Sequence, residues 1–511
     1  MKNKVCIFLF FCIFLVFISC NNSNSEEYET STENATIKLR TSSGKEYTPF
    51  FINKSGFHFS VSNDEDLSNM QSIIIDTHGN EKCYDCADYS NFCVPVEVED
   101  PFVSINPEKK KIIIYDLPIL MINTPDGQPI MSKEIRVEDC DVNLITFNGK
   151  QELGKAGIKG RGNSTWLQEK KPYNIKFDEK QSILGMKSSK KWVLLANAYY
   201  DRTQLHNATA FEIARLTDYE WVQSGQFVEL ILNGEHKGLY YLCEKIDIEK
   251  EKINIDKLKE KDLDKDKITG GYLLEIDNTS LDKNPVENYS FVTDYFNKTT
   301  TTPWYPTLSK LYWILKEPEE NVPNEQFLYI QSHINNVESL LYSDNNLEAH
   351  DYEQYLDLDS IINWWFVEEI ALNEEAARSK NLYIYKKRGD NKLYFGPPWD
   401  LDAWTFGIRG TKRFFAKPSF YYAQLFKDPS FVNKVKEKWL EYKPIWEERI
   451  PLFIEEQYEL IHRAAERNET MWTDWNPVNN YETKTYEQLI KDMKNSFFIQ
   501  LEWMDSEIKN L

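Results

Sequence analysis

The feature that most constrains the fold of this chain is a change of pattern within residues 117–511. Up to residue 277, apolar runs of strand length alternate with turns rich in Gly, Asn and Asp, which is typical of β-strands. From about residue 305 onward, large apolar side chains recur mostly at helical spacing, most clearly in residues 359–372 and 418–511. This pattern predicts an α+β fold in which a strand-rich lobe precedes a helix-rich lobe.

Turn and helix signals place three local elements within this region. Asn233-Gly234 lies between two apolar runs and predicts a β-hairpin. A second hairpin is expected around residues 389–391. Residues 200–216 carry apolar side chains mostly at three-residue steps, which predicts a helix with Asp201 or Thr203 as its cap.

Residues 1–20 have the pattern of a targeting segment. Lys2 and Lys4 precede an apolar stretch, residues 5–18, which has secretory length and is too short for a membrane span. Ser19-Cys20 ends the stretch in the manner of a bacterial lipobox. We therefore expect a lipoprotein signal peptide, cleavage before Cys20, a lipid on Cys20, and anchoring in the bacterial cell envelope, at the outer membrane or cell surface. Ordinary secretion with Cys20 unmodified is the alternative.

The remaining chain divides into four expected parts. The polar residues 21–36 predict a flexible tether. Residues 37–116 contain short strand-like runs separated by Asn, Asp, Ser and Gly, and predict a small, sandwich-like all-β domain that acts as a spacer. Residues 117–440 are expected to form the main domain, and residues 441–511 a C-terminal helical extension.

Charge and cysteine content limit the classes of function. A formal net charge of −21 argues against a general nucleic-acid binder, although a local basic pocket for a nucleotide is compatible with it. Cys83, Cys86 and Cys93 could hold zinc or form a disulfide, with no fourth zinc ligand close by. Cys140 and Cys243 lie in strand-like runs and are expected to be buried thiols.

The segment GPPWDLDAWTFG, residues 396–407, carries the clearest chemical signal. In an extended segment the side chains of Asp400 and Asp402 would point the same way, and two converging carboxylates suit a hard cation such as Mg²⁺ or Mn²⁺. The alternative is a loop with two solvated acids. Neighbouring Trp399, Trp404 and Phe406 favour the metal site, because a dry environment makes uncompensated charge costly.

A Gly-rich turn and a strand lysine suggest phosphate binding. In residues 160–165, small side chains would let backbone N–H groups approach a phosphate, and Arg161 could form a fork onto it. Lys176, on the next strand, occupies the place of a phosphate-gripping lysine, and Glu212 could pair with it. A tight hairpin turn, a surface lysine and a solvated glutamate are the alternatives.

A third group of polar residues follows the helix predicted at 359–372. Asn373-Glu374-Glu375 precedes a strand with Asn381 at its start. In protein kinases an acid orients the acceptor hydroxyl, a nearby Asn helps to hold metal, and a later Asp takes the main metal. The chain thus presents a glycine turn, a lysine, a glutamate, an acid, an asparagine and an aspartate in the order found in a kinase.

The chain resembles the spore-coat-protein-H (CotH) kinase family over residues 117–440. The resemblance is carried by several segments: Ile158–Trp166, Lys171–Lys176, Lys191–Asn197, Phe227–Leu230, Asn233-Gly234, Gly238–Tyr240, Glu244-Lys245, Gly271–Glu275 and Trp399–Asp402. It implies a two-lobed, atypical protein-kinase-like domain that binds ATP and a divalent metal. It also implies transfer of the γ-phosphoryl group to Ser or Thr of an extracytoplasmic protein substrate in the envelope.

The resemblance also implies roles for individual residues. They are catalysis for Glu375 or Glu374, metal binding for Asp400, Asp402 and Asn381, and ATP binding for Arg161, Asn163, Ser164, Lys176, Glu212 and Glu244. Many family members carry Asp where this chain has Glu375, and a shift of one methylene matters to catalysis. A catalytically silent surface lipoprotein that binds protein or glycan through its abundant Trp and Tyr is therefore the alternative function.

Overall fold

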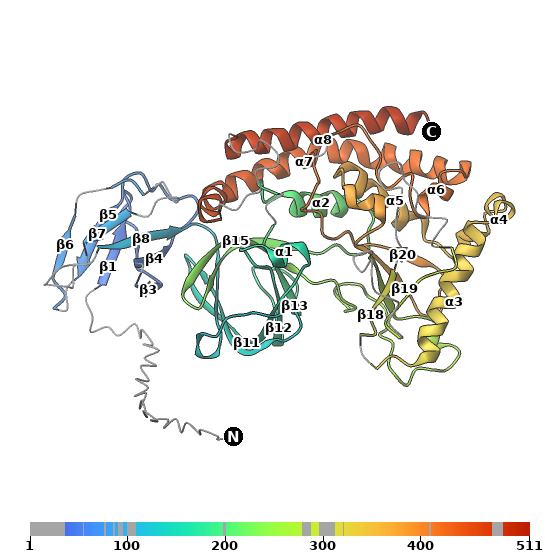
Figure 1. Ribbon diagram of the computed structural model, residues 1–511. Coiled ribbons are helices and arrows are strands. Elements are labelled where there is room, and N and C mark those ends of the chain that lie inside the picture. Colours follow the sequence, from blue (N-terminus) through green and yellow to red (C-terminus); the bar gives the residue numbers. More distant parts are fainter. Residues whose placement is uncertain are drawn as a thin grey trace, which may run out of the picture.

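The computed structural model describes residues 36–54, 56–75, 78–84, 87–89, 96–99, 109–197, 201–277, 288–295, 312–319, 321–407, 410–472 and 484–511 (Figure 1). The fold is α+β, with β-rich structure first and helices toward the C-terminus, as the sequence pattern predicts. Within these described ranges, no helix is both long and apolar enough to cross a membrane. Cys20, Cys86 and Cys93 lie outside the described residues.

Two four-stranded sheets form the N-terminal region. Their strand orders are β2-β1-β5-β6 and β3-β4-β8-β7. A single hydrophobic cluster takes residues from both sheets, including Leu39, Phe59, Ile74 and Ile114. The strands are β1 (Thr36–Arg40), β2 (Glu46–Tyr47), β3 (Phe51–Asn53), β4 (Gly56–Ser60), β5 (Gln71–Ile75), β6 (Glu81–Cys83), β7 (Val96–Glu99) and β8 (Lys109–Tyr115).

A closed barrel of strand order β10-β11-β12-β13-β15-β14-β9 follows. Its strands are β9 (Ile119–Asn123), β10 (Val137–Thr146), β11 (Gly149–Gly160), β12 (Tyr173–Gln181), β13 (Ser189–Leu195), β14 (Gly225–Leu232) and β15 (Glu235–Glu244). The predicted Asn233-Gly234 hairpin is confirmed as the β14–β15 connection. Cys140 and Cys243, on β10 and β15, are buried free thiols as expected.

Side chains alternate between the inside and the outside of the barrel, as the two-residue period of a strand requires. On β13, Trp192 and Leu194 pack inside the barrel with Ile175 of β12. Val193 and Leu195 face outward and join the large core that the helices share. Side chains on the outer face of β13 therefore contact the rest of the molecule, whereas those on its inner face fill the barrel.

A second, five-stranded sheet has the order β17-β18-β16-β19-β20. Its strands are β16 (Tyr272–Asp277), β17 (Ser290–Phe291), β18 (Tyr312–Glu317), β19 (Leu382–Lys386) and β20 (Leu393–Phe395). The hairpin predicted around residues 389–391 is confirmed as the β19–β20 pair. The expectation of a helical chain after residue 305 is wrong at β18, because its six residues form antiparallel bridges to β16 and β17.

Helices pack around both the barrel and the second sheet. The α-helices are α1 (Ser164–Leu167), α2 (His206–Arg215), α3 (Asn324–Leu341), α4 (Asp344–Glu348), α5 (Leu358–Ile370), α6 (Tyr422–Leu425), α7 (Pro429–Met471) and α8 (Tyr486–Lys509). Short 3₁₀ turns are η1 (Pro125–Gly127), η2 (Lys267–Thr269), η4 (Asp351–Gln354) and η5 (Glu374–Arg378). The predicted helix 200–216 is shorter at its start, and the Asp201 carboxylate accepts from the His206 N–H at 2.9 Å.

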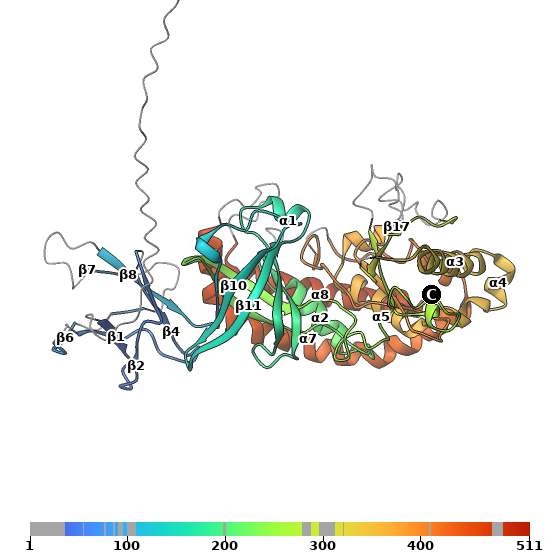
Figure 2. The ribbon, with the colours of Figure 1, turned by 90° about the horizontal axis from the view of Figure 1, so that it is seen from below.

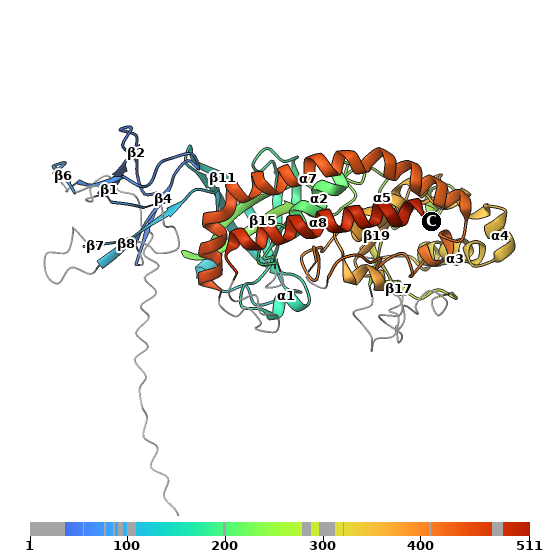
Figure 3. The ribbon, with the colours of Figure 1, turned by 90° about the horizontal axis from the view of Figure 1, so that it is seen from above.

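The longest helix, α7, runs alongside most of the molecule. It has 43 residues and so extends about 65 Å. Figure 3 shows α7 and α8 side by side. Figure 2, which is seen from below, shows the barrel strands β10 and β11 in front of these helices. Gly238 of β15 allows the close approach of α7, because a Cβ there would lie 2.5 Å from Asn468 Oδ1.

Candidate active site

The candidate site begins at the buried end of α5. The Asn373 side chain accepts a hydrogen bond from the Glu375 N–H at 3.0 Å and so caps η5. Asn373 Nδ2 in turn donates to Glu368 Oε2 at 2.6 Å. Burial raises the pKa of Glu368 to about 8. This chain of contacts fixes the turn that carries Glu374 and Glu375, both of which are partly exposed.

Three of the predicted site residues meet in space. Asn381 Nδ2 lies 3.2 Å from Glu375 Oε2 and 3.2 Å from Asp400 Oδ2. Glu375 comes from η5, Asn381 from the start of β19 and Asp400 from the loop after β20. The cluster therefore joins three segments that are separated along the chain, as the kinase-like order of residues predicts.

A fourth member of the cluster, Lys380, was not singled out from the sequence. Its Nζ lies 2.7 Å from Glu375 Oε1. Burial acts to lower the pKa of Lys380, but the carboxylates of Glu375, Asp400 and Asp277 outweigh burial and raise it. The only signal in the sequence was its position immediately before Asn381.

The electrostatics of Glu375 follow from the same neighbours. Burial raises the pKa of the Glu375 carboxyl, and the nearby Asp400 charge raises it further, while Lys380 opposes both effects. A carboxylate with a raised pKa beside a fixed cation is able to accept a proton more readily than a free glutamate.

The backbone around the cluster is held in an uncommon conformation. Ser379, Asn381 and Asp400 have φ values of +53°, +59° and +64°, in the left-handed region. Asn and Asp tolerate this region better than most residues, and such conformations concentrate at functional sites. Asp400 is therefore not in an extended segment. The expectation that Asp400 and Asp402 point the same way assumed an extended chain, and this assumption is wrong at Asp400.

Asp402 has a different environment from Asp400. It is buried, and its backbone carbonyl lies 3.2 Å from His206 Nδ1 of α2. Leu401, between the two acids, donates its N–H to Asn207 Oδ1 at 2.9 Å. The loop is thus fastened to the start of α2 on the Asp402 side, and Asp400 is bonded to Asn381.

The Gly-rich turn reaches the same loop through Arg161. The guanidinium carbon of Arg161 lies 5.4 Å from the centre of the Trp399 ring, directly before Asp400. Glycine is needed at Gly160, where a Cβ would lie 2.3 Å from the Trp166 ring. The structure therefore brings the turn of residues 160–165 toward the loop that carries Asp400.

Other residues of the turn and the next strand lie farther out. Asn163 is exposed and accepts from Lys133 Nζ at 3.3 Å, and Ser164 is the exposed first residue of α1. Lys176 is exposed on the outer face of β12, opposite Lys191 of β13. Among the described residues, Lys176 forms no hydrogen bond or ion pair.

Two glutamates expected near ATP have other partners. Glu212 Oε2 pairs with Arg215 Nε at 2.9 Å, and Glu212 Oε1 lies 3.6 Å from Arg449 Nε. The expected Glu212–Lys176 pair is wrong, because α2 presents Glu212 to its own last turn and to α7. Glu244 is buried, accepts from the Ser224 N–H at 2.9 Å, and has its pKa raised by burial.

One lysine that was given no role from the sequence connects the barrel to the second sheet, and another forms an ion pair within that sheet. Lys191 Nζ lies 2.9 Å from Asp247 Oδ2 and 3.5 Å from Glu317 Oε1 of β18. Lys316 Nζ pairs with Glu275 Oε2 at 2.8 Å. Lys191 is the cross-strand neighbour of Lys176, so its position on the strand was the available signal.

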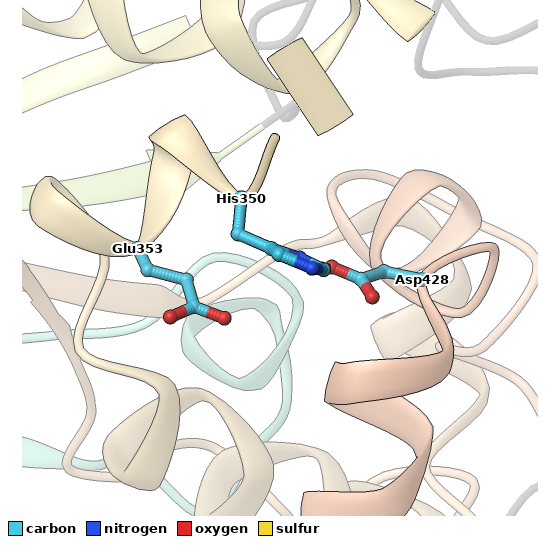
Figure 4. A group of neighbouring side chains, drawn as sticks. All are labelled: His350, Glu353 and Asp428. Carbon is cyan, nitrogen blue, oxygen red and sulfur yellow. The ribbon is translucent and has the colours of Figure 1, made fainter. Parts of the chain in front are cut away.

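A separate group of metal-type side chains lies near the start of α7 (Figure 4). Within the part of the chain that the structure describes, one cluster of three His, Cys, Asp or Glu side chains is close enough to hold a metal ion, and it consists of His350, Glu353 and Asp428. His350 Nδ1 is 2.6 Å from Asp428 Oδ2, and Asp428 also caps α7 through the Ser430 N–H at 2.8 Å. Both Asp428 oxygens thus have protein partners, and the helix cap accounts for this group.

The donor chemistry of the main cluster suits a hard cation. The carboxylates of Glu375 and Asp400 offer oxygen ligands of the type that Mg²⁺ and Mn²⁺ prefer, and the amide nitrogen of Asn381 lies between them. A family model described as CotH kinase protein matches residues 158–498. No curated protein sequence matches the chain.

Proposed function

Because this chain belongs to the CotH kinase family, we propose that it is an ATP-dependent protein kinase that phosphorylates Ser or Thr of a cell-envelope protein. The observation that best supports the proposal is the cluster of Glu375, Asn381 and Asp400, with Lys380 bonded to Glu375. A two-lobed kinase arrangement, with the barrel as one lobe and the second sheet with its helices as the other, belongs to the same proposal.

In the proposed reaction, Glu375 accepts a hydrogen bond from the acceptor hydroxyl and takes its proton as the new O–P bond forms. The bond between the γ-phosphorus and the β-bridging oxygen breaks, and ADP carries away the electron pair. Lys380 and Asn381 hold the Glu375 carboxylate in position. Positioning of the reacting groups is a major source of rate enhancement in phosphoryl transfer.

Asp400 and Asn381 are the proposed ligands of a divalent cation, which would supply charge neutralisation to the phosphates. Arg161, beside Trp399, is the proposed phosphate contact from the Gly-rich turn. Lys176 stays a proposed contact. Lys191 is a rival candidate for the phosphate-binding lysine, because its ion pairs with Asp247 and Glu317 fix its position.

The test is phosphoryl transfer from labelled ATP to a mixed set of Ser/Thr peptides with Mg²⁺ or Mn²⁺. Asp400→Asn should abolish calorimetric binding of ATP that depends on metal, with an unchanged melting temperature. Asp402→Asn is the informative comparison, because Asp402 is the buried acid of the same loop, beside α2. Unaltered metal-dependent binding in Asp400→Asn would refute the metal assignment, and absence of transfer by the wild type would favour the silent binding module.

A further inference from the structure

A groove separate from the catalytic cluster opens between residues 413–418, helix α6 and the C-terminal part of α8. Its volume is about 560 Å³. Three basic side chains and three aromatic rings line most of it: Arg413, Lys417, Lys427, Phe414, Phe426 and Trp503. A local basic lining is unusual on this chain, whose formal net charge is −21.

Two of these cations are available to an acidic ligand. Lys417 Nζ lies 5.3 Å from the centres of both the Phe414 and Phe426 rings. Lys427 is exposed, and its Nζ donates to Gln424 Oε1 at 2.8 Å. Neither lysine forms an ion pair with a carboxylate of the described residues, although the charges of Glu507 and Glu369 act on Lys417.

Two lysines of α8 outside the groove do have acidic partners. On α8, Lys494 pairs with Glu455 at 2.7 Å and Lys509 pairs with Asp505 at 2.6 Å. The groove instead brings Lys417 and Lys427 together with Arg413 in one place. Charge complementarity therefore favours an acidic occupant for the groove.

The aromatic rings form walls of the groove. The Phe414 and Trp503 ring centres are 4.7 Å apart. Phe414 and Phe426 also pack on the buried Trp365, with ring centres 5.3 Å and 4.9 Å from it. All three rings are half-buried, whereas insertion into a bilayer needs rings that project from the surface. A peptide segment fits this shape better than a membrane.

The segment that lines one side of the groove packs against the turn that carries Glu375. Glu369 of α5 accepts the backbone N–H groups of Phe415, Ala416 and Lys417 at 2.6, 2.8 and 2.8 Å. The Phe415 ring packs with Leu372 and Ala377, which lie on either side of Glu375. A segment bound in the groove would therefore run close to the residue that we assign to the acceptor hydroxyl.

We propose that this groove binds an acidic segment of the protein substrate, next to the Ser or Thr that is phosphorylated. The inference has two parts, and its second part, the placement of the Ser or Thr for phosphorylation, rests on the proposed kinase function. Its first part, the binding of acidic peptide, is independent of catalysis and can be measured without nucleotide.

The experiment uses the full chain and a short fluorescein-labelled peptide of Asp and Glu with one central Ser. Anisotropy without nucleotide should show binding that weakens with added salt, and the matched Asn/Gln peptide should not bind. Lys427→Glu should weaken binding by about tenfold or more. Lys491→Glu, a charge reversal on an exposed position of α8 before the groove, is the matched control and should leave binding unchanged.

Lys417→Gln gives a second variant that keeps the backbone contacts to Glu369 and should also weaken binding. If Lys427→Glu and Lys417→Gln bind the acidic peptide as the wild type does, the inference is wrong. Binding of anionic vesicles in place of the peptide would also overturn it.

Phosphoryl transfer separates this inference from the kinase proposal. If the protein is an active kinase, Lys427→Glu should raise KM for the acidic peptide and leave transfer to a neutral Ser peptide unchanged. If the protein binds the acidic peptide through these lysines but transfers no phosphate, the kinase proposal fails and the groove stands. If it transfers phosphate with equal KM for both peptides, the groove inference fails and the kinase proposal stands.

Discussion

At the residue scale, the central question is how one glutamate is positioned. Glu375 has three fixed neighbours: the Asn373 cap at its backbone, and Lys380 and Asn381 at its carboxylate. The family resemblance leads us to expect Asp at this place, and the longer side chain of Glu extends the carboxylate by one methylene. The contacts to Lys380 and Asn381 hold this longer side chain in one orientation.

Single substitutions of Glu374 and Glu375 test which of the two is the catalytic acid. Glu375→Gln should leave ATP binding intact and lower turnover by about 100-fold, because positioning matters chiefly in the transition state. Glu374→Gln is the matched control on the same turn. Glu375→Asp should keep or raise activity. Single-turnover transfer from labelled ATP gives the rates, and a loss confined to Glu374→Gln would reassign the role to Glu374.

Lys380 should act on turnover through its bond to Glu375. Lys380→Met removes the 2.7 Å contact, and turnover should fall by roughly 10- to 100-fold with little change in ATP affinity. Lys380→Arg keeps a cation near the carboxylate and should retain more activity. Comparison of kcat with calorimetric ATP binding checks this. A loss of ATP affinity with kcat unchanged would instead make Lys380 a phosphate contact.

At the element scale, the C-terminal part of α7 ties the N-terminal sheets to the barrel. Arg467 bonds both to Glu229 of β14 and to the backbone carbonyl of Ile114 on β8. His236 bonds to the same Glu229. His58 of β4 reaches the Tyr115 hydroxyl at 2.9 Å. This buried network links three parts of the molecule through ionisable groups.

The network predicts loss of stability in mild acid. Burial, together with the charges of His236 and Arg467, lowers the pKa of His58 to about 3. An unfolded histidine titrates near 6.5, so the folded state binds fewer protons below that pH. Stability should be full above pH 6.5 and should fall as the pH decreases toward about 3. His236, whose pKa burial also lowers, acts in the same direction.

Melting temperatures between pH 7.5 and pH 5 check this prediction. His58→Gln should show a smaller decrease over that range than the wild type, because it removes one such proton uptake. His462→Gln, at a partly exposed position of α7, is the control and should show the same decrease with pH as the wild type. A wild type whose melting temperature rises on acidification would contradict the assignment.

At the scale of the whole molecule, the β-rich N-terminal region lies between residue 20 and the catalytic part of the chain. Asn53 Nδ2 donates to Gly234 O of the barrel at 2.9 Å, so this region contacts the barrel at its β14–β15 turn (Figure 1). We propose that the chain is anchored through a lipid on Cys20 and that residues 37–116 act as a spacer from the membrane.

Anchoring predicts a change of cell fraction. Cys20→Ala should move the protein from the membrane fraction to the soluble envelope fraction, because the lipid supplies the attachment. Ser19→Ala, which keeps a small residue before the cysteine, is the matched control and should remain in the membrane fraction. Fractionation with immunoblotting measures both, and a Cys20→Ala protein still bound to membranes would contradict lipid anchoring.

Local patterns were sufficient for the elements whose stability is local. The Asn233-Gly234 turn, the β19–β20 hairpin, helix α5 and the long C-terminal helices were predicted from periodicity and turn residues. The kinase-like order of residues also singled out Glu375, Asn381 and Asp400, which the fold brings together.

Closure of the barrel, the partners of charged side chains and the groove depended on tertiary structure. Parallel pairing of β9 with β14 closes the barrel across about 110 residues and has no local signature. Lys176 and Glu212 were paired by analogy, but the packing of α2 against α7 turns Glu212 toward Arg215 and Arg449. The sequence does not identify the ion-pair partner of a charged side chain, because long side chains pair with whichever group the fold brings within reach. The sequence therefore determined which residues could do the chemistry, and the packing of distant segments decided which of them meet.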